Sequence, residues 1–327
     1  MLRKWEFVLS IILILATAGC QPVVPQPAPD ASEPETIAPL EPEPAVTEPL
    51  RILFVGDQVM AENLGYDVHF AAMAAAADPP AQVETQRVIL AADGDAPEER
   101  IRAASLQGLW QAGEVMDALG AGPWDWVVFH QDMALPAYAL EMTPEAYAEF
   151  GQTYVEYAAK FASEVEKAGA KMALVVPWHY KSEMYVTMDD MLRVVRRAAD
   201  ETGATVIPVG LVWQRVKPDD PAIEAPDRLD SCDVCGLRHL RRTDPALDLY
   251  APDSDNSPNI AGTYLTAAAV YAALLDRNPA YAVYAPTDAL PAAGPNAQLR
   301  DAWKDVDANA LPLRKTAWKV VEEYRNR

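Results

Sequence analysis

The stretch that decides the fold is Arg51–Met60, RILFVGDQVM, in which an apolar run ends at a glycine followed by two polar residues. A continuous run of this kind, containing β-branched residues, is typical of a strand buried on both faces of a parallel sheet. Gly56 allows the backbone to turn tightly where the strand ends. Because ligands of open α/β sheets bind beyond the carboxyl ends of the strands, we expect Asp57 and Gln58 to face a crevice.

Strand patterns alternate with helical patterns along the rest of the chain. Further strands are expected at 82–90, 124–130, 171–177 and 205–209, and helices at 61–77, 97–119, 143–168, 187–202, 262–275 and 311–324. Thr143, followed by a proline and a glutamate, is typical of the start of a helix. The alternation predicts one three-layer α/β/α domain over residues 50–327, with a flavodoxin-like parallel sheet of about five strands.

Polar and aromatic side chains follow the expected strands at the point where each strand ends. Because the carboxyl ends of parallel strands lie at one edge of a sheet, we expect these side chains to share a pocket. The candidate pocket residues are Asp57, Gln58, Gly94, His130, Gln131, Asp132, Trp178, His179, Asp253 and Asp255. For both histidines a hydrogen-bonded structural role and a role in the pocket are open. Trp178 and the nearby Tyr180 are candidates for an aromatic pocket wall, with packing at the sheet margin as the alternative.

The order and spacing of these segments resemble those of the SGNH/GDSL hydrolases, a family of esterases and acetylesterases on a flavodoxin-like sheet. ILFVGDQ at 52–58 is similar to the first block of the family, Gly94 to the glycine of the second block, and FHQD at 129–132 to the third. SDNSPNIAGTYLTAAAVYAALL at 254–275 is similar to the last block, and LPLRKTAWKVVEEY at 311–324 to the terminal helix. The resemblance covers nearly the whole of the predicted domain.

The resemblance implies a serine nucleophile after Gly-Asp, and a histidine base in the last block with an aspartate three residues before it. Here Gln58 stands at the nucleophile position, Ser257 at the histidine position and Ser254 at the aspartate position. Of the implied oxyanion donors Gly94 is retained, and Gln131 stands where the family has asparagine. An amide cannot be activated as an alkoxide, so we expect a non-catalytic binding or accessory protein whose ligand is a glycan or an acylated glycan.

Two other functions are open. An active esterase or acetylesterase on carbohydrate would need a rearranged or metal-assisted site, and the aspartates and histidine among the pocket candidates are ligand types for Zn²⁺, Mn²⁺ or Ca²⁺. The segment 253–257 lacks the glycine and distal glutamate of a calcium loop, so a solvated acidic loop is the alternative, and we expect no cofactor. The third possibility is a structural envelope protein that binds a partner.

The first 49 residues have the features of an exported, anchored protein. A basic start, a short apolar run and the ending Thr17-Ala18-Gly19-Cys20 resemble a bacterial lipoprotein signal peptide at 1–19, which implies lipidation of Cys20. An uncleaved anchor or an ordinary signal peptide is the alternative. Residues 21–49 hold nine prolines and six acidic residues without lysine or arginine, which predicts a disordered tether at 20–49. We therefore expect an extracytoplasmic domain held at a bacterial membrane.

Charge and cysteine content limit the partners further. The formal net charge is -21, from 48 acidic and 27 basic residues, so the surface repels nucleic acid. Cys232 and Cys235 lie in an insertion expected around 217–245. A close cysteine pair outside the cytoplasm is typical of a short disulfide. With His239 the C-x2-C-x3-H spacing leaves a zinc site as the alternative. The sequence makes no prediction of the oligomeric state.

Overall fold

The structure, a computed structural model, describes residues 49–327 except 93, 95, 183, 217–247, 253, 255 and 291–298, and leaves out the side chains of 299, 301, 302 and 305. Several predictions fall outside the described residues and stay untested: the signal peptide with Cys20, the tether, the insertion with Cys232, Cys235 and His239, and the pocket candidates Asp253 and Asp255. Within the described ranges, no helix combines the length and the apolar character that a membrane-spanning segment requires.

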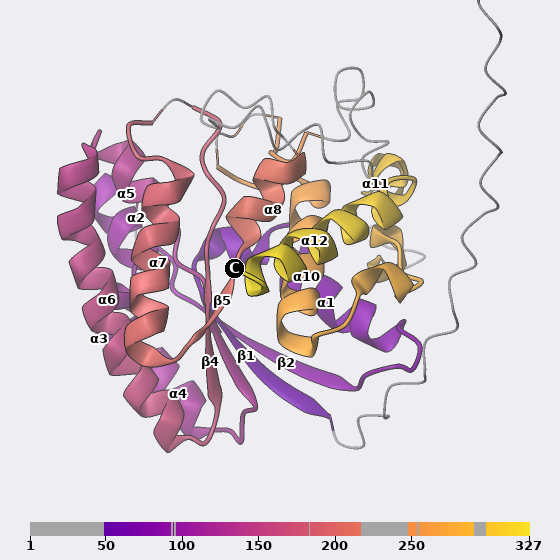
Figure 1. Ribbon diagram of the computed structural model, residues 1–327, viewed down its shortest axis with the longest axis horizontal. Helices are drawn as coiled ribbons and strands as arrows, with labels where there is room; N and C mark the ends of the chain where they lie inside the picture. The colour runs from indigo at the N-terminus through magenta and orange to yellow at the C-terminus, as the bar shows by residue number, and fades with distance from the viewer. Residues whose placement is uncertain are drawn as a thin grey trace, which may run out of the picture. The chain divides into compact units, whose positions relative to one another are not determined.

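Five parallel strands form one sheet in the order β2-β1-β3-β4-β5 (Figure 1). The strands are β1 (Leu50–Gly56), β2 (Val83–Ile89), β3 (Trp126–Phe129), β4 (Lys171–Val175) and β5 (Thr205–Ile207). Residues 52–55 of β1 are fully buried, as expected of a strand covered on both faces. The strand order is that of flavodoxin-like folds, and the predicted fold class is confirmed.

Helices cover both faces of this sheet. The α-helices are α1 (Tyr66–Ala75), α2 (Pro97–Ala103), α3 (Leu106–Ala112), α4 (Glu114–Gly120), α5 (Ala134–Ala139), α6 (Pro144–Lys167), α7 (Met188–Thr202), α8 (Val209–Val216), α10 (Ile260–Leu275), α11 (Leu299–Asp307) and α12 (Ala310–Arg325), and the 3-10 helices are η1 (Gln58–Leu64), η4 (Pro279–Tyr281) and η5 (Pro286–Ala289). On one face lie α3, α4, α6 and α7, and on the other α1, α8, α10 and α12 (Figure 1). The described domain therefore has the three layers that the sequence predicts.

Two predicted helices are interrupted. The segment expected as one helix at 97–119 forms α2, α3 and α4, because the Ser105 hydroxyl accepts a hydrogen bond from the Gly108 amide at 3.0 Å and begins a new helix. Gly113 ends α3 with a φ of 82°. In the helix expected at 61–77, Gly65 with a φ of 95° separates η1 from α1. Side-chain capping and left-handed glycines thus divide segments of helical composition.

Candidate functional site

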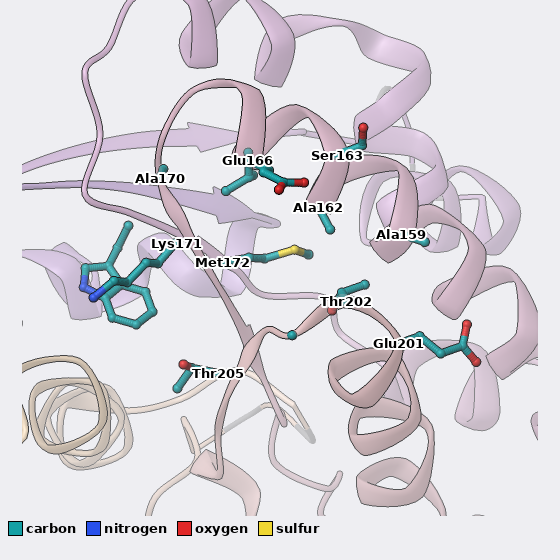
Figure 2. Close-up of a pocket in the computed structure, with 13 residues that line it drawn as sticks. Ala159, Ala162, Ser163, Glu166, Ala170, Lys171, Met172, Glu201, Thr202 and Thr205 are labelled. Carbon is teal, nitrogen blue, oxygen red and sulfur yellow. The ribbon is translucent and has the colours of Figure 1, made fainter.

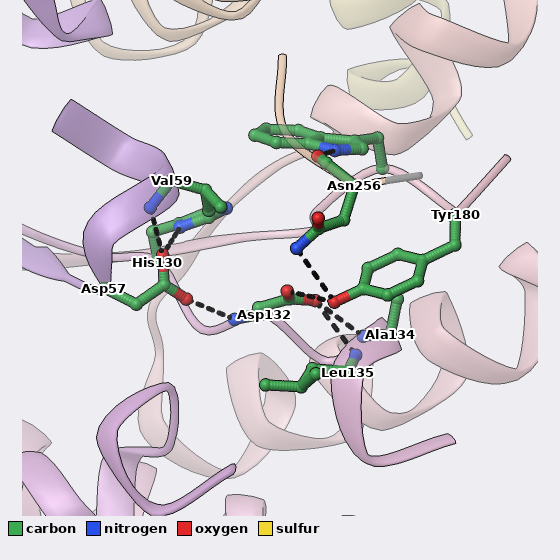
Figure 3. Close-up of polar contacts among 9 residues, drawn as sticks. Asp57, Val59, His130, Asp132, Ala134, Leu135, Tyr180 and Asn256 are labelled. Carbon is green, nitrogen blue, oxygen red and sulfur yellow. Dashed lines mark hydrogen bonds and ion pairs between the residues drawn. The ribbon is translucent and has the colours of Figure 1, made fainter. Parts of the chain in front are cut away.

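A chain of polar contacts connects the loops at the carboxyl edge of the sheet (Figure 3). It begins at Asp57, directly after β1, whose Oδ1 accepts a hydrogen bond from the Val59 amide at 3.2 Å and so caps η1. The other oxygen of Asp57, Oδ2, accepts from the Asp132 amide at 3.1 Å. Asp57 therefore holds the loop after β1 against the loop after β3.

The second carboxylate in this chain is Asp132, which is 6% exposed. Its Oδ1 accepts from the amides of Ala134 and Leu135 at 3.1 and 3.0 Å, where α5 begins, and its Oδ2 accepts from the Tyr180 hydroxyl at 2.6 Å. Burial, together with the charge of Asp57, raises the pKa of Asp132 to about 6, against the opposing effect of the Tyr180 hydrogen bond. Burial at the carboxyl edge therefore favours the protonated form of Asp132.

The chain of contacts continues from Tyr180 into the loop before α10. The Asn256 side-chain amide donates to the Tyr180 hydroxyl at 3.2 Å, and the Ser254 hydroxyl donates to Asn256 Oδ1 at 3.0 Å. The Ser257 hydroxyl is hydrogen-bonded to Glu62 of η1. Burial raises the pKa of Glu62, and the bond from Ser257 opposes this shift. The two serines thus bond to an amide and a glutamate.

His130, the residue directly after β3, makes no side-chain hydrogen bonds of this kind. Its side chain is fully buried, stacked on the Trp178 ring at 5.5 Å between centroids and edge-on to the Tyr66 ring at 6.1 Å. His130 Nδ1 lies 3.6 Å from Asp57 Oδ1, too far for a hydrogen bond. Among the described residues, neither ring nitrogen of His130 has a hydrogen-bond partner. Such an unsatisfied buried group is uncommon in folded proteins.

Solved structures are similar to parts of this arrangement of strands and helices. A DUF4886 family protein from Bacteroides uniformis matches with a TM-score of 0.50 and 12% identity, over 86% of this chain and 97% of that one. A protein from Slackia heliotrinireducens described as a candidate SGNH hydrolase matches with a TM-score of 0.40 and 20% identity, over 69% and 100%. An acetylxylan esterase from Geobacillus stearothermophilus matches with a TM-score of 0.44 and 16% identity, over 69% and 93%. The match to the DUF4886 family protein shows a shared fold, whose strand order in this chain is flavodoxin-like.

Identities this low show a similarity of fold alone and carry no activity to this chain. No protein-family model matches the sequence, and no curated protein does. It therefore stays a prediction from the sequence that Gln58, Ser254 and Ser257 stand at the triad positions of the SGNH/GDSL hydrolases. To this prediction the structure adds only the location of the three side chains.

Three further candidates lie at the same edge of the sheet with different surroundings. Gln58 is exposed at the start of η1. Gln131 is buried, and its Oε1 accepts from the Leu106 amide at 2.8 Å, where α3 begins. Gly94 is exposed in the loop between β2 and α2. Gln131 thus uses its acceptor oxygen to cap a helix, whereas Gln58 is an exposed residue.

The structure gives His179 and its neighbours a packing role. The ring nitrogens of His179 face the carbonyl oxygens of Tyr180 and Val186 at 2.9 and 2.8 Å, so this histidine holds its own loop together. Trp178 is 4% exposed and stacks on Trp213 of α8 at 4.5 Å. Tyr180 is 3% exposed. For His179, Trp178 and Tyr180 the sequence leaves open a role in the pocket or a structural role. In the structure all three side chains are buried and take part in packing or structural hydrogen bonds.

The aromatic side chain exposed next to this group is Tyr138, which the sequence interpretation missed. Its ring lies 5.2 Å from the Tyr180 ring and is 42% exposed. Tyr138 belongs to α5, a six-residue helix that has no amphipathic pattern to reveal it. No signal in the sequence distinguished Tyr138 from the buried tyrosines of the chain.

Metal ligands and cavities complete the description of this edge. Within the described part of the chain, no group of three or more histidine, cysteine, aspartate or glutamate side chains is placed to hold a metal ion. Two cavities are described: one of about 510 Å³ at the amino ends of β3, β4 and β5 (Figure 2), and one of about 100 Å³ between α6 and α7. Neither of them is lined by a pocket residue that the sequence predicts.

Proposed function

We propose that this chain is a membrane-anchored extracytoplasmic lipoprotein whose SGNH-hydrolase-like domain binds a glycan or an acylated glycan without hydrolysing it. The observation that carries the non-catalytic part is Gln58, an exposed amide directly after β1 and Asp57. An amide in this place offers hydrogen bonds to a ligand but no group that attacks an ester.

The two histidines at this edge support the same proposal. A general base in serine hydrolysis needs the hydroxyl within hydrogen-bond reach. His130 has no such partner among the described residues, and the ring nitrogens of His179 contact backbone carbonyl oxygens. In the described part of the chain no serine is therefore paired with a histidine.

The chemistry of the exposed groups favours a glycan as the ligand. Gln58 and the partly buried Asn256 and Ser254 are neutral hydrogen-bonding groups that suit sugar hydroxyls. Tyr138 adds an exposed ring, held in place by Tyr180, whose apolar face suits the C–H face of a sugar ring. The net charge of -21 disfavours polyanionic ligands.

Hydrolysis of p-nitrophenyl acetate by the purified protein tests the non-catalytic part. We expect no turnover above that of buffer. Gln58→Ser gains none, because Ser254 and Ser257 supply neither a base nor a group to orient it. Turnover by the natural chain that disappears in Gln58→Ala would contradict this part of the proposal.

Calorimetric titration with a panel of neutral and acetylated oligosaccharides tests the binding part. We expect Tyr138→Ala to weaken a detected interaction about fivefold, the scale of one aromatic contact. Tyr281→Ala is the matched control, because Tyr281 on η4 is 47% exposed. If no oligosaccharide binds, the binding function is wrong; if Tyr138→Ala binds normally, only the role of that residue is wrong.

One contact favours a second candidate function, an esterase with a rearranged site. The Ser257 hydroxyl is hydrogen-bonded to Glu62, and a carboxylate beside a hydroxyl is one way to activate a nucleophile. The same p-nitrophenyl acetate assay separates the two functions: turnover abolished by Ser257→Ala and by Glu62→Gln supports the esterase.

The anchor rests on the sequence of residues 1–20. Metabolic labelling of expressing cells with palmitate tests it directly. We expect label and membrane association in the natural chain, and the loss of both in Cys20→Ser. A labelled Cys20→Ser protein, or an unlabelled natural chain in the soluble fraction, would contradict the anchor without affecting the proposed binding function.

A further inference from the structure

The amino edge of the sheet carries a cavity that the proposed function does not use. Its volume is about 510 Å³, within the range of small-molecule sites. It lies where β3, β4 and β5 begin, beside the C-terminal turns of α6 and α7 (Figure 2). In a parallel sheet this edge is opposite to the one where the polar chain of Asp57 and Asp132 lies.

The inner wall of this cavity is apolar. Met172 of β4 and Ala162 and Val165 of α6 line it, and Figure 2 shows the Met172 side chain at the centre of the group. The half-buried ring of Trp126, the first residue of β3, adds an aromatic surface. These side chains suit a ligand with a short apolar body.

The rim of the cavity carries two glutamates as well as Lys171. Glu166 and Glu201 belong to the last turns of α6 and α7, whose C-terminal carbonyl groups add partial negative charge. Arg197 pairs with Glu201 at 3.1 Å and partly neutralises it. Glu166, which is exposed, therefore contributes the larger share of the negative charge that a ligand meets.

A cation of the chain itself already lies at this rim. The Nζ atom of Lys171 is 5.3 Å from the centroid of the Trp126 ring, within the range of a cation–π contact. Lys171 is exposed, so its ammonium group exchanges the ring for water at little cost. The Trp126 ring is thus a surface on which an ammonium group rests and from which it is readily displaced.

We propose that this cavity binds an organic ammonium compound, an amine with a short apolar body. Its ammonium group takes the place of Lys171 Nζ on the Trp126 ring, and its apolar body covers Met172. Anions are disfavoured, because both glutamates and the two helix ends repel them. The inference is independent of any glycan bound at the carboxyl edge.

Calorimetric titration of the purified protein with pentylamine tests the proposal, with pentanol as the uncharged probe of the same length. We expect saturable binding of pentylamine and none of pentanol. Glu166→Gln weakens pentylamine binding about fivefold, the upper scale of an exposed charge pair. Glu149→Gln removes the same charge from an exposed position on α6 outside the cavity, and leaves the affinity unchanged.

A second variant gives an effect of the opposite sign. Lys171→Met removes the competing ammonium group, so pentylamine binds about threefold more tightly, the scale of one exposed cation–π contact. Its control is Lys160→Met, because Lys160 Nζ lies over the Tyr157 ring at 3.9 Å elsewhere on α6. Equal binding of the two probes, equal weakening by the two glutamine variants, or weaker binding by Lys171→Met overturns the proposal.

Discussion

The two edges of the sheet differ in what fills them. At the carboxyl edge Asp57, Asp132 and Tyr180 are each at most 6% exposed and bond to one another or to neighbouring backbone. At the amino edge the strands begin beside a cavity of about 510 Å³ with a charged rim. Ligands of open α/β sheets usually bind at the carboxyl edge. The comparison teaches that the fold determines where polar side chains gather, but not how much room they leave.

This difference has a direct energetic consequence. A buried polar side chain stabilises a protein only while its partners are in place, and removing one partner leaves the other unsatisfied. Substitutions at the carboxyl edge should therefore change the free energy of unfolding. Substitutions at the exposed rim of the amino edge should change ligand affinity and leave stability nearly constant.

Trp178→Ala should give the largest effect at the carboxyl edge. The Trp178 ring is buried between His130 and Trp213, and its Nε1 donates to the Asn256 carbonyl oxygen at 2.8 Å. Its removal should lower the free energy of unfolding by about 3–5 kcal/mol, measured by urea denaturation. Tyr185→Ala, at a position 71% exposed after the same strand, should change it by less than about 0.5 kcal/mol. Similar small losses in both variants would mean that this edge is open.

Asp132→Asn should change the pH dependence of stability. Because burial raises the pKa of Asp132 to about 6, the folded protein binds this proton more tightly than the unfolded chain does, whose carboxyl has a pKa of about 3.9. The stabilisation is present below the unfolded value and is lost as the pH rises through about 6. The natural chain should therefore lose up to about 3 kcal/mol relative to Asp132→Asn between about pH 4 and pH 7.

Urea denaturation of both proteins at the two pH values measures this difference. Asp200→Asn, an exposed position on α7, serves as the control and should give the same difference from the natural chain at both pH values. A natural chain that gains stability relative to Asp132→Asn as the pH rises would show that Asp132 is stabilised as a carboxylate.

Tyr180→Phe should give a smaller loss. The substitution keeps the ring but removes the hydroxyl that donates to Asp132 Oδ2 at 2.6 Å and accepts from Asn256 Nδ2 at 3.2 Å. The two groups lose a buried partner, so the free energy of unfolding should fall by about 1–3 kcal/mol. Tyr138→Phe is the matched control on the exposed neighbouring ring. If the natural chain and Tyr180→Phe unfold at the same midpoint temperature, the carboxyl edge is not held together by these buried hydrogen bonds.

The sequence predicted the fold better than the site. Four of the five strands follow from short apolar runs bounded by turn residues, whereas β2 contains four polar residues. Thr143 and Thr187 cap α6 and α7 through their hydroxyls. The predicted helix at 97–119 was wrong as a single element, because a single serine hydroxyl and a left-handed glycine interrupt it. Such breaks depend on local side-chain hydrogen bonds that compete with the hydrogen bonds of a helix. They are not visible in the amino-acid composition of the segment.

At the site, the positions of Asp57 and Asp132 could be predicted, because β1 and β3 pair in parallel and end at the same level. Their degree of burial could not. The burial of Trp178 depends on Trp213, which belongs to α8, and the link through Tyr180 depends on Asn256 in a loop far along the chain. A pattern read along the sequence carries no information on such distant partners, and it gave no indication of the cavity at the amino edge.

Glu166→Gln should have the smallest effect on stability, and its sign sharpens the comparison. Glu166 lies in the last turn of α6, where a negative charge opposes the helix dipole. Removing that charge should raise the free energy of unfolding by about 0.3 kcal/mol at low salt, and the gain should disappear at high salt. Glu149→Gln, further from the end of the helix, should show neither effect. If Glu166 weakens its own helix yet strengthens pentylamine binding, its position serves a ligand. If Glu166→Gln instead lowers the free energy of unfolding by more than about 1 kcal/mol, Glu166 is a structural residue. The two edges of the sheet would then differ less than we infer.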